Sequence, residues 1–163
     1  MRSLWRTLDR ATVRAIGVMY LSVFVIGMSY GVSGHSVGLT WWQLTLIATV
    51  VLAGSSEFVF LSVLVAGGAP WLGAAAGVLI NTRNLGYGLA VGPSVGTGVR
   101  MLLGAHLIND ESAALTAAQT EPTRARATFL LSGVGVLVTW PAGALLGAVL
   151  GNLVADPAVL GLD

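Results

Sequence analysis

Five ionisable side chains lie inside segments of this sequence that are otherwise strongly apolar: Glu57, Arg83, His106, Asp110 and Glu111. A charge at the centre of a bilayer costs roughly 2.5–3.5 kcal/mol on insertion scales, so such residues normally face the protein interior and mark a substrate or ion path. The structural alternative for any one of them is a buried ion pair that fixes helix register. That alternative explains all five together less well.

The acidic segment "HLINDES" places several of these groups on one helical face. His106, Asn109 and Asp110 are spaced i, i+3 and i+4, whereas Glu111 is rotated from Asp110 by about 100°. His106 and Asp110 also have the spacing of metal ligands on a helix, but two ligands do not make a zinc site. We therefore expect carboxylate chemistry here and no bound metal.

The segment "LINTRNLGYG" places a guanidinium between two amides. Asn81 and Asn84 share one helical face, and Arg83 points in the same direction as Tyr87. Counting along the helix puts Arg83 near the middle of its span, at a depth similar to that of Glu57 and of the acids in "NDES". Opposite charges at matched depth can pair, so Arg83 either holds a substrate or only neutralises Glu57 or Asp110.

Together these groups suit a zwitterionic ligand. The planar fork of an arginine matches a carboxylate, whereas carboxylates suit an ammonium group, and a carboxylate withdrawn from water can exchange protons near neutral pH. We predict substrate binding by Arg83, Asn81, Tyr87 and Asn84, and proton coupling or ammonium binding by Asp110, Glu111, Glu57 and His106.

The composition excludes a soluble protein. Of 163 residues, 55% are hydrophobic and 9% are charged, against roughly 25% charged in soluble domains. The net charge of +1 gives no nucleic-acid surface, and the absence of cysteine excludes disulfides and thiolate metal sites. "GTGVRMLLG" lacks the lysine of a phosphate-binding loop, so no cofactor is expected.

Segments of about 20 apolar residues span a bilayer as helices. The sequence predicts an all-α integral membrane protein, a bundle of about five helices at 15–34, 42–66, 70–92, 99–118 and 128–154, with 15–163 forming one transmembrane domain. Glycine stripes at Gly73 and Gly77, and at Gly143, Gly147 and Gly151, would let helices pack closely.

Two of these segments carry interruptions. "LAGSSEF" breaks the second with Gly54, Ser55 and Ser56, and "VTWPAG" breaks the fifth with Pro141. Broken helices at membrane depth line cavities, and transporters use them as binding sites. An ordinary proline kink is the alternative for Pro141. The interruptions leave open an inverted-repeat transporter fold.

The orientation follows from the arginines. The basic flank 1–14 carries Arg2, Arg6, Arg10 and Arg14, which places the N-terminus in the cytoplasm of a multi-pass inner-membrane protein. With five crossings in all, the loop before the fifth helix, which carries Arg124 and Arg126, returns to the same side. An interfacial anchor helix and a cleaved signal peptide are the less favoured interpretations of the flank.

"LAGSSEF", "LINTRNLGYG" and "INDESAAL" occur in the order and at the spacing of motifs in the AzlC family, the large subunits of branched-chain amino acid exporters, which this chain resembles over about residues 15–163. By this resemblance, Asn81, Arg83, Tyr87 and Gly88 match the signature of the third helix, and Asp110 and Glu111 match the acids of the fourth. Two residues depart from the pattern: Glu57 stands where glutamine is common, and Asn84 where histidine is common.

The resemblance implies export of leucine, isoleucine, valine and in some members methionine, together with a small AzlD-like membrane subunit. It also implies further helices beyond Asp163, so this chain is expected to lack the C-terminal part of the family. We expect a proton-coupled exporter subunit that contacts lipid. The sequence leaves open whether the chain forms a homo-oligomer. Two alternatives are a structural membrane subunit without a substrate and, less favoured, a membrane-embedded enzyme using His106, Asp110 and Glu57.

Overall fold

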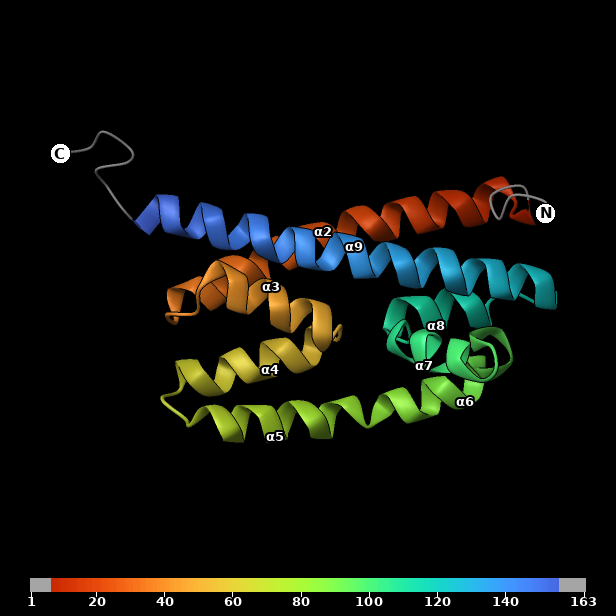
Figure 1. Cartoon of the computed structure of the whole chain (residues 1–163). Helices are drawn as coiled ribbons and strands as arrows, with labels where there is room; N and C mark the ends of the chain where they lie inside the picture. The colour runs from red at the N-terminus through yellow and green to blue at the C-terminus, as the bar shows by residue number, and fades with distance from the viewer. Residues whose placement is uncertain (1–6, 156–163) are drawn as a thin grey trace. The chain divides into compact units, whose positions relative to one another are not determined.

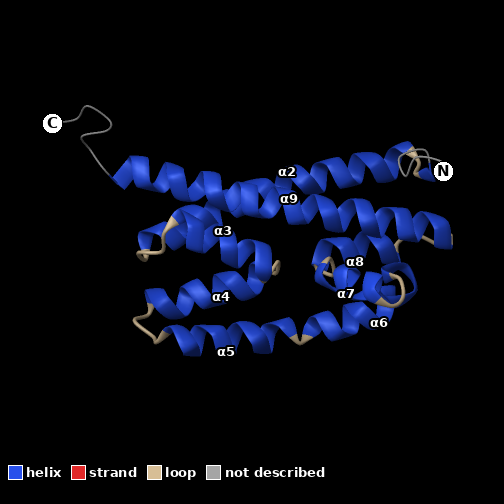
Figure 2. Cartoon of the chain, in the orientation of Figure 1, coloured by secondary structure: helices blue, strands red, loops and turns tan. Residues whose placement is uncertain are grey.

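The computed structural model describes residues 7–155, and the side chains of 152–155 are left aside. Arg2 and Arg6 of the basic flank, and the segment 156–163, lie outside the described residues. The described part is helical, with no strand in it, and short loops join the helices (Figure 2). In order (Figure 1), the helices are α2 Arg10–Ser36, α3 Trp41–Val50, α4 Gly54–Val65, α5 Pro70–Asn81, α6 Arg83–Val95, α7 Val99–His106, α8 Asp110–Ala117 and α9 Pro122–Ala155.

By its internal contacts the chain divides into two compact units. Unit 1 comprises residues 1–22 and 82–138, and unit 2 comprises residues 23–81 and 139–163. Within unit 2, α4 packs against α5, and within unit 1, α6 packs against α7 and α8. Among the described residues, each unit contains three consecutive short helices: α3, α4 and α5 in unit 2, and α6, α7 and α8 in unit 1.

The second segment is interrupted, but at residues 51–53: Gly54, Ser55 and Ser56, the predicted break residues, are the first three residues of α4. The chain leaves helical geometry between Val50 and Gly54, where Leu52 takes a left-handed backbone conformation with φ of 49°. That conformation costs an L-residue roughly 1–2 kcal/mol. Leu52 is nevertheless buried at 2% exposure, so packing of its side chain holds the break in place.

Two predicted helices are divided where the sequence analysis expected continuity. The segment 70–92 is α5 and α6, with Thr82 between them. The segment 99–118 is α7 and α8, separated at 107–109. In the second case the reason is local: Asn109 is an N-cap whose side chain accepts from the Ser112 N–H at 2.8 Å, so a new helix begins there.

The interruption predicted at Pro141 is wrong, because α9 continues through this residue from Pro122 to Ala155. A proline removes one backbone donor and crowds the preceding turn. Close packing on α2 compensates in unit 2: a Cβ on Gly143 or Gly147 would overlap the carbonyl oxygens of Phe24 and Met28, respectively. The small-residue stripe predicted on α9 therefore forms a helix–helix contact, at least at these two glycines.

The same contact gives a stability prediction from the side of α2. Gly31→Ala should destabilise the protein by about 1–3 kcal/mol, because its Cβ would overlap the carbonyl oxygen of Ala144 and lie 2.7 Å from the Ala148 nitrogen. Gly17→Ala, on the same helix with no atom within 4 Å of the added Cβ, is the matched control. It should stabilise by about 0.5–1 kcal/mol through helix propensity. Unfolding in detergent followed by circular dichroism measures both, and an unchanged Gly31→Ala midpoint would contradict the packing.

Two of the described helices are long and apolar enough to cross a membrane, α2 and the part Pro122–Gly151 of α9. α4 is a shorter apolar helix. Large apolar side chains are also widely exposed, among them Leu79 at 71%, Leu85 at 74% and Leu89 at 87%. Lipid is the medium in which such surfaces are stable, so the fold supports the predicted membrane character.

Candidate functional site: an apolar pocket with a buried glutamate

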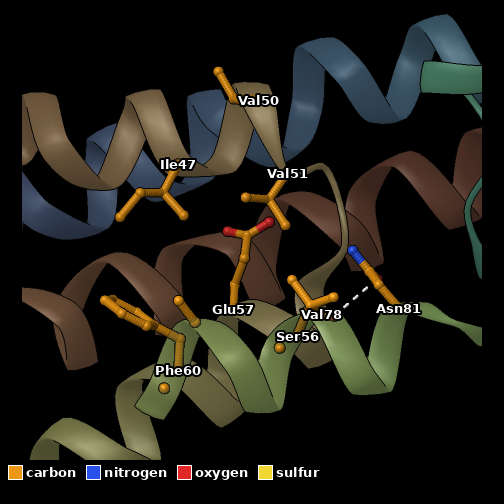
Figure 3. Close-up of a pocket in the computed structure, with 11 residues that line it drawn as sticks. Ile47, Val50, Val51, Ser56, Glu57, Phe60, Val78 and Asn81 are labelled. Carbon is orange, nitrogen blue, oxygen red and sulfur yellow. Dashed lines mark hydrogen bonds between the residues drawn. The ribbon is translucent and has the colours of Figure 1, made fainter. Parts of the chain in front are cut away.

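Unit 2 contains a pocket of about 420 Å³ beside the break between α3 and α4 (Figure 3). Its lining is almost wholly aliphatic, aromatic or small, and the polar exceptions are Ser56, Glu57 and Asn81. Pockets of this size hold small organic ligands, with a few polar groups fixing their orientation. The apolar lining residues are Ile47, Val50, Val51, Phe60, Gly73, Ala74, Gly77 and Val78.

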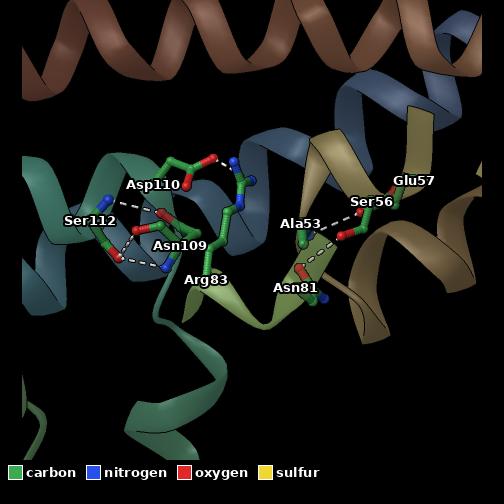
Figure 4. A network of polar contacts seen from close by, with 8 residues as sticks. All are labelled: Ala53, Ser56, Glu57, Asn81, Arg83, Asn109, Asp110 and Ser112. Carbon is green, nitrogen blue, oxygen red and sulfur yellow. Dashed lines mark hydrogen bonds and ion pairs between the residues drawn. The ribbon is translucent and has the colours of Figure 1, made fainter. Parts of the chain in front are cut away.

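Glu57 is 1% exposed, and two N–H groups hold its carboxylate. Oε1 accepts hydrogen bonds from the Ala53 N–H at 3.1 Å and from Trp140 Nε1 at 3.0 Å, and Oε2 lies 3.1 Å from the same Trp140 nitrogen. The carboxylate therefore caps the start of α4 across the break (Figure 4) and also borders the pocket. Both of these donors are neutral, so neither of them neutralises the acid.

An aromatic cluster lies behind the glutamate. Trp140 stacks on Tyr30 with ring centroids 5.5 Å apart, and Phe58 meets both rings edge-on. The Tyr30 hydroxyl is buried and lies close enough to the Glu57 carboxylate to interact with it. Gly54 leaves room for the indole, since a Cβ there would lie 3.1 Å from Trp140 Cη2. No pattern in the sequence links Trp140 or Tyr30 to Glu57.

Asn81 closes another side of the pocket. The Ser56 hydroxyl donates to Asn81 Oδ1 at 2.8 Å, which links the first turn of α4 to the last residue of α5 (Figure 4). This bond orients the Asn81 amide and leaves its nitrogen, a donor group, at the pocket lining. Gly77, one turn earlier on α5, lets the two helices approach, since its Cβ would lie 3.3 Å from the Ser56 carbonyl oxygen.

Unit 1 contains a separate ionic network. Arg83, the first residue of α6, forms an ion pair through Nη2 with Asp110 Oδ2, the first residue of α8 (Figure 4). The side chains are 35% and 40% exposed, so the pair is half-buried. Tyr87, one turn along α6, interacts with the same Asp110 carboxylate. Glu111 interacts electrostatically with both Tyr87 and Asp110. Of the two partners predicted for Arg83, the structure shows Asp110.

The break before α8 is stabilised by its own side chains. Asn109 Oδ1 and Ser112 Oγ cap each other's backbone N–H, and Ser112 Oγ also donates to the Leu107 carbonyl at 2.7 Å. Both residues are buried. The signal was present in the sequence, because Asn followed by Ser three residues later is a capping pattern. These contacts place Asp110 and Glu111 in the first turn of α8.

The predicted site residues thus fall into two groups. Ser56, Glu57 and Asn81 come together in unit 2, and Arg83, Tyr87, Asp110 and Glu111 come together in unit 1. Asn84 is half-buried in the first turn of α6, and His106 is exposed at the end of α7. Within residues 7–155 there is no cluster of three or more His, Cys, Asp or Glu side chains able to hold a metal.

Long apolar helices, a helix break beside an apolar pocket and a buried acid at that pocket are features of helical membrane transport proteins. The model of the family described as AzlC protein matches residues 18–154. The match covers most of the sequence, so the chain belongs to the AzlC family.

A curated relative extends this finding. The chain is 26% identical over 139 residues to the branched-chain amino acid transport protein AzlC of Bacillus subtilis (strain 168), a match covering 83% of this chain and 55% of the relative. The chain therefore spans about half the length of this relative. No solved structure matches the sequence.

Proposed function

We propose that this chain is a component of a membrane exporter of branched-chain amino acids, and that the pocket of unit 2 receives the substrate. The observation that carries the proposal is the aliphatic pocket bordered by a buried carboxylate without a cationic partner among its hydrogen-bond donors. An aliphatic side chain fits the lining of Ile47, Val50 and Val78. The printed name of the relative, a branched-chain amino acid transport protein, supports the same substrate class.

Glu57 and Asn81 divide the polar end of the substrate between them. The Glu57 carboxylate receives the ammonium group, since a charge-assisted hydrogen bond is the strongest contact available in an apolar pocket. The Asn81 amide nitrogen donates to the substrate carboxylate. Both residues line the pocket and belong to unit 2. In this arrangement Glu57 neutralises the ammonium group and Asn81 hydrogen-bonds the carboxylate, so neither end of the substrate is buried without a partner.

The ionic network of unit 1 is the candidate for coupling to protons. Asp110 and Glu111 are acids beside a fixed guanidinium, so protonation of either changes the net charge around Arg83. The earlier assignment of Arg83 to the substrate carboxylate stays a prediction, and a substrate there would compete with Asp110. We further propose a small AzlD-like partner, an inner-membrane location and a cytoplasmic N-terminus, in line with the arginine pattern.

Uptake of labelled leucine into inverted vesicles, with the chain and the small subunit co-expressed, tests the transport function. A saturable uptake that collapses when the proton gradient is dissipated supports a proton-coupled exporter. Transport that persists without the gradient would contradict the coupling, and absence of leucine binding to the purified protein would contradict the substrate.

The pocket also predicts selectivity by volume. Ala74→Leu adds three carbon atoms to the pocket lining without changing its charge. It should weaken leucine binding by about tenfold or more while affecting alanine much less, because the larger side chain no longer fits. Val59→Leu on α4, a half-buried residue outside the pocket lining, is the control. Equal losses for leucine and alanine would show that the pocket does not hold the aliphatic side chain.

A further inference from the structure

A second pocket, of about 320 Å³, lies in unit 1 where α6 and α8 end and α9 begins. Its polar lining residues are Ser94, Thr116, Gln119 and Thr120. The remaining lining residues are Ala90, Val91, Pro93, Ala117, Pro122 and Ala125. It contains none of the residues assigned to the substrate or to the ionic network.

The lining is rich in acceptors and carries no formal charge. Hydroxyl groups come from Ser94, Thr116 and Thr120, and an amide from Gln119. Pro93 and Pro122 contribute no backbone N–H. α6 ends at Val95 and α8 at Ala117, so two helix C-termini, the negative ends of their dipoles, lie at this pocket. The positive N-terminus of α9 also lies here, although its first residue, Pro122, has no N–H to offer. Two negative helix ends against one positive end favour a cation over an anion.

One side chain points independently to a ligand. Thr116 is 3% exposed, and its Oγ1 is buried without a hydrogen-bond partner. Leaving a buried hydroxyl unpaired costs about 1–3 kcal/mol, so such a group calls for an explanation. Thr116 lines the pocket, and Ser94 on the facing helix is also buried, at 7% exposure. A ligand bound between these hydroxyls would satisfy Thr116.

We propose that this pocket is a binding site for a monovalent metal cation, with sodium as the probe. Hydroxyl oxygens and the carbonyl ends of short helices are the ligands that hold sodium in membrane transporters. Divalent calcium relies on carboxylates, and the lining has none. The charge of neighbouring Arg124 on α9 is already paired with Asp9, at 2.8 Å. The volume leaves room for the cation to keep part of its hydration shell.

Thermal unfolding of the purified full chain in detergent, titrated with sodium chloride against choline chloride at constant ionic strength, tests the site. Sodium should raise the unfolding midpoint saturably where choline does not. Thr116→Val, which keeps the side-chain shape, should raise the half-saturating sodium concentration about tenfold, and Ser94→Ala should do the same if Thr116→Val fails to fold. Because no amino acid is present, this result is independent of the proposed transport function.

Thr128→Val is the matched control. Thr128 is also a fully buried threonine of unit 1 with an unpartnered Oγ1, but it does not line the pocket. It should keep the sodium dependence of the wild type. Equal effects of sodium and choline, or loss of the sodium effect in Thr128→Val as much as in Thr116→Val, would overturn the proposal.

Discussion

Glu57→Gln is expected to weaken leucine binding to the purified protein by about 10- to 100-fold, because it removes the only charge among the lining residues of the pocket. A hydrogen bond to a charged group contributes about 1.5–3 kcal/mol, which corresponds to that range. The fold should survive the change. Glutamine keeps an oxygen that can accept from the Ala53 N–H or from Trp140 Nε1, as Glu57 does now. Equilibrium binding of labelled leucine measures the first effect and thermal unfolding the second.

Glu121→Gln provides the matched control for the loss of one carboxylate. Glu121 is exposed in the loop before α9, where it caps the Thr123 and Arg124 backbone N–H groups. Leucine binding should be unchanged in this variant. If Glu57→Gln binds leucine as the wild type does, Glu57 only caps the start of α4, and the substrate assignment of the pocket is lost.

Trp140→Phe separates the two roles of Glu57. It removes the N–H that contacts both carboxylate oxygens and keeps a ring beside Tyr30 and Phe58. A mispositioned carboxylate should weaken leucine binding less than Glu57→Gln does. If Glu57 is purely structural, the Trp140→Phe protein should instead lose thermal stability while its affinity for leucine stays unchanged.

The second large effect is expected from a double-mutant cycle on Arg83 and Asp110. Each single change to alanine leaves one half-buried charge without this partner and should destabilise the protein by about 1–3 kcal/mol. If the pair is structural, the double variant recovers about 1 kcal/mol as coupling energy. Leucine transport then distinguishes a structural pair from a functional one. Transport lost in the single variants is restored in the double variant only if the pair does nothing beyond neutralising charge. The measurements are chemical unfolding and vesicle uptake.

Asp9 and Arg124 form the control pair for this cycle. Their side chains are 45% and 37% exposed, close to the values for Asp110 and Arg83. The Thr12 backbone N–H, together with Arg124, holds the pKa of Asp9 below its usual range, so the pair is charged at neutral pH. The same cycle on this pair should leave transport intact. Transport lost equally in both cycles would mean that the flux reports only on stability.

The sequence by itself determined the class of this protein. An apolar chain with 9% charged residues cannot fold in water around so little polar surface, so helices in a membrane followed from composition. The region of the break was also readable from "LAGSSEF", although the break itself lies at 51–53 and the glycine and serines begin α4. The break before Asp110 was equally local, because the capping pair of Asn109 and Ser112 encodes it, although the apolar run over 99–118 predicts one continuous helix.

Only the tertiary structure decided the partners of the charged residues. Glu57 is held by Trp140, 83 positions away in the sequence, and no helical periodicity links the two. Arg83 had two acids at similar predicted depth, and the packing of α6 against α8 selected Asp110. The backbone at Pro141 also depends on tertiary packing. Proline locally favours a break in a helix, but close packing of Gly143 and Gly147 on α2 keeps α9 continuous. The depth of a side chain in the membrane follows from its position along one helical segment. Its neighbours, in contrast, depend on how separate segments pack.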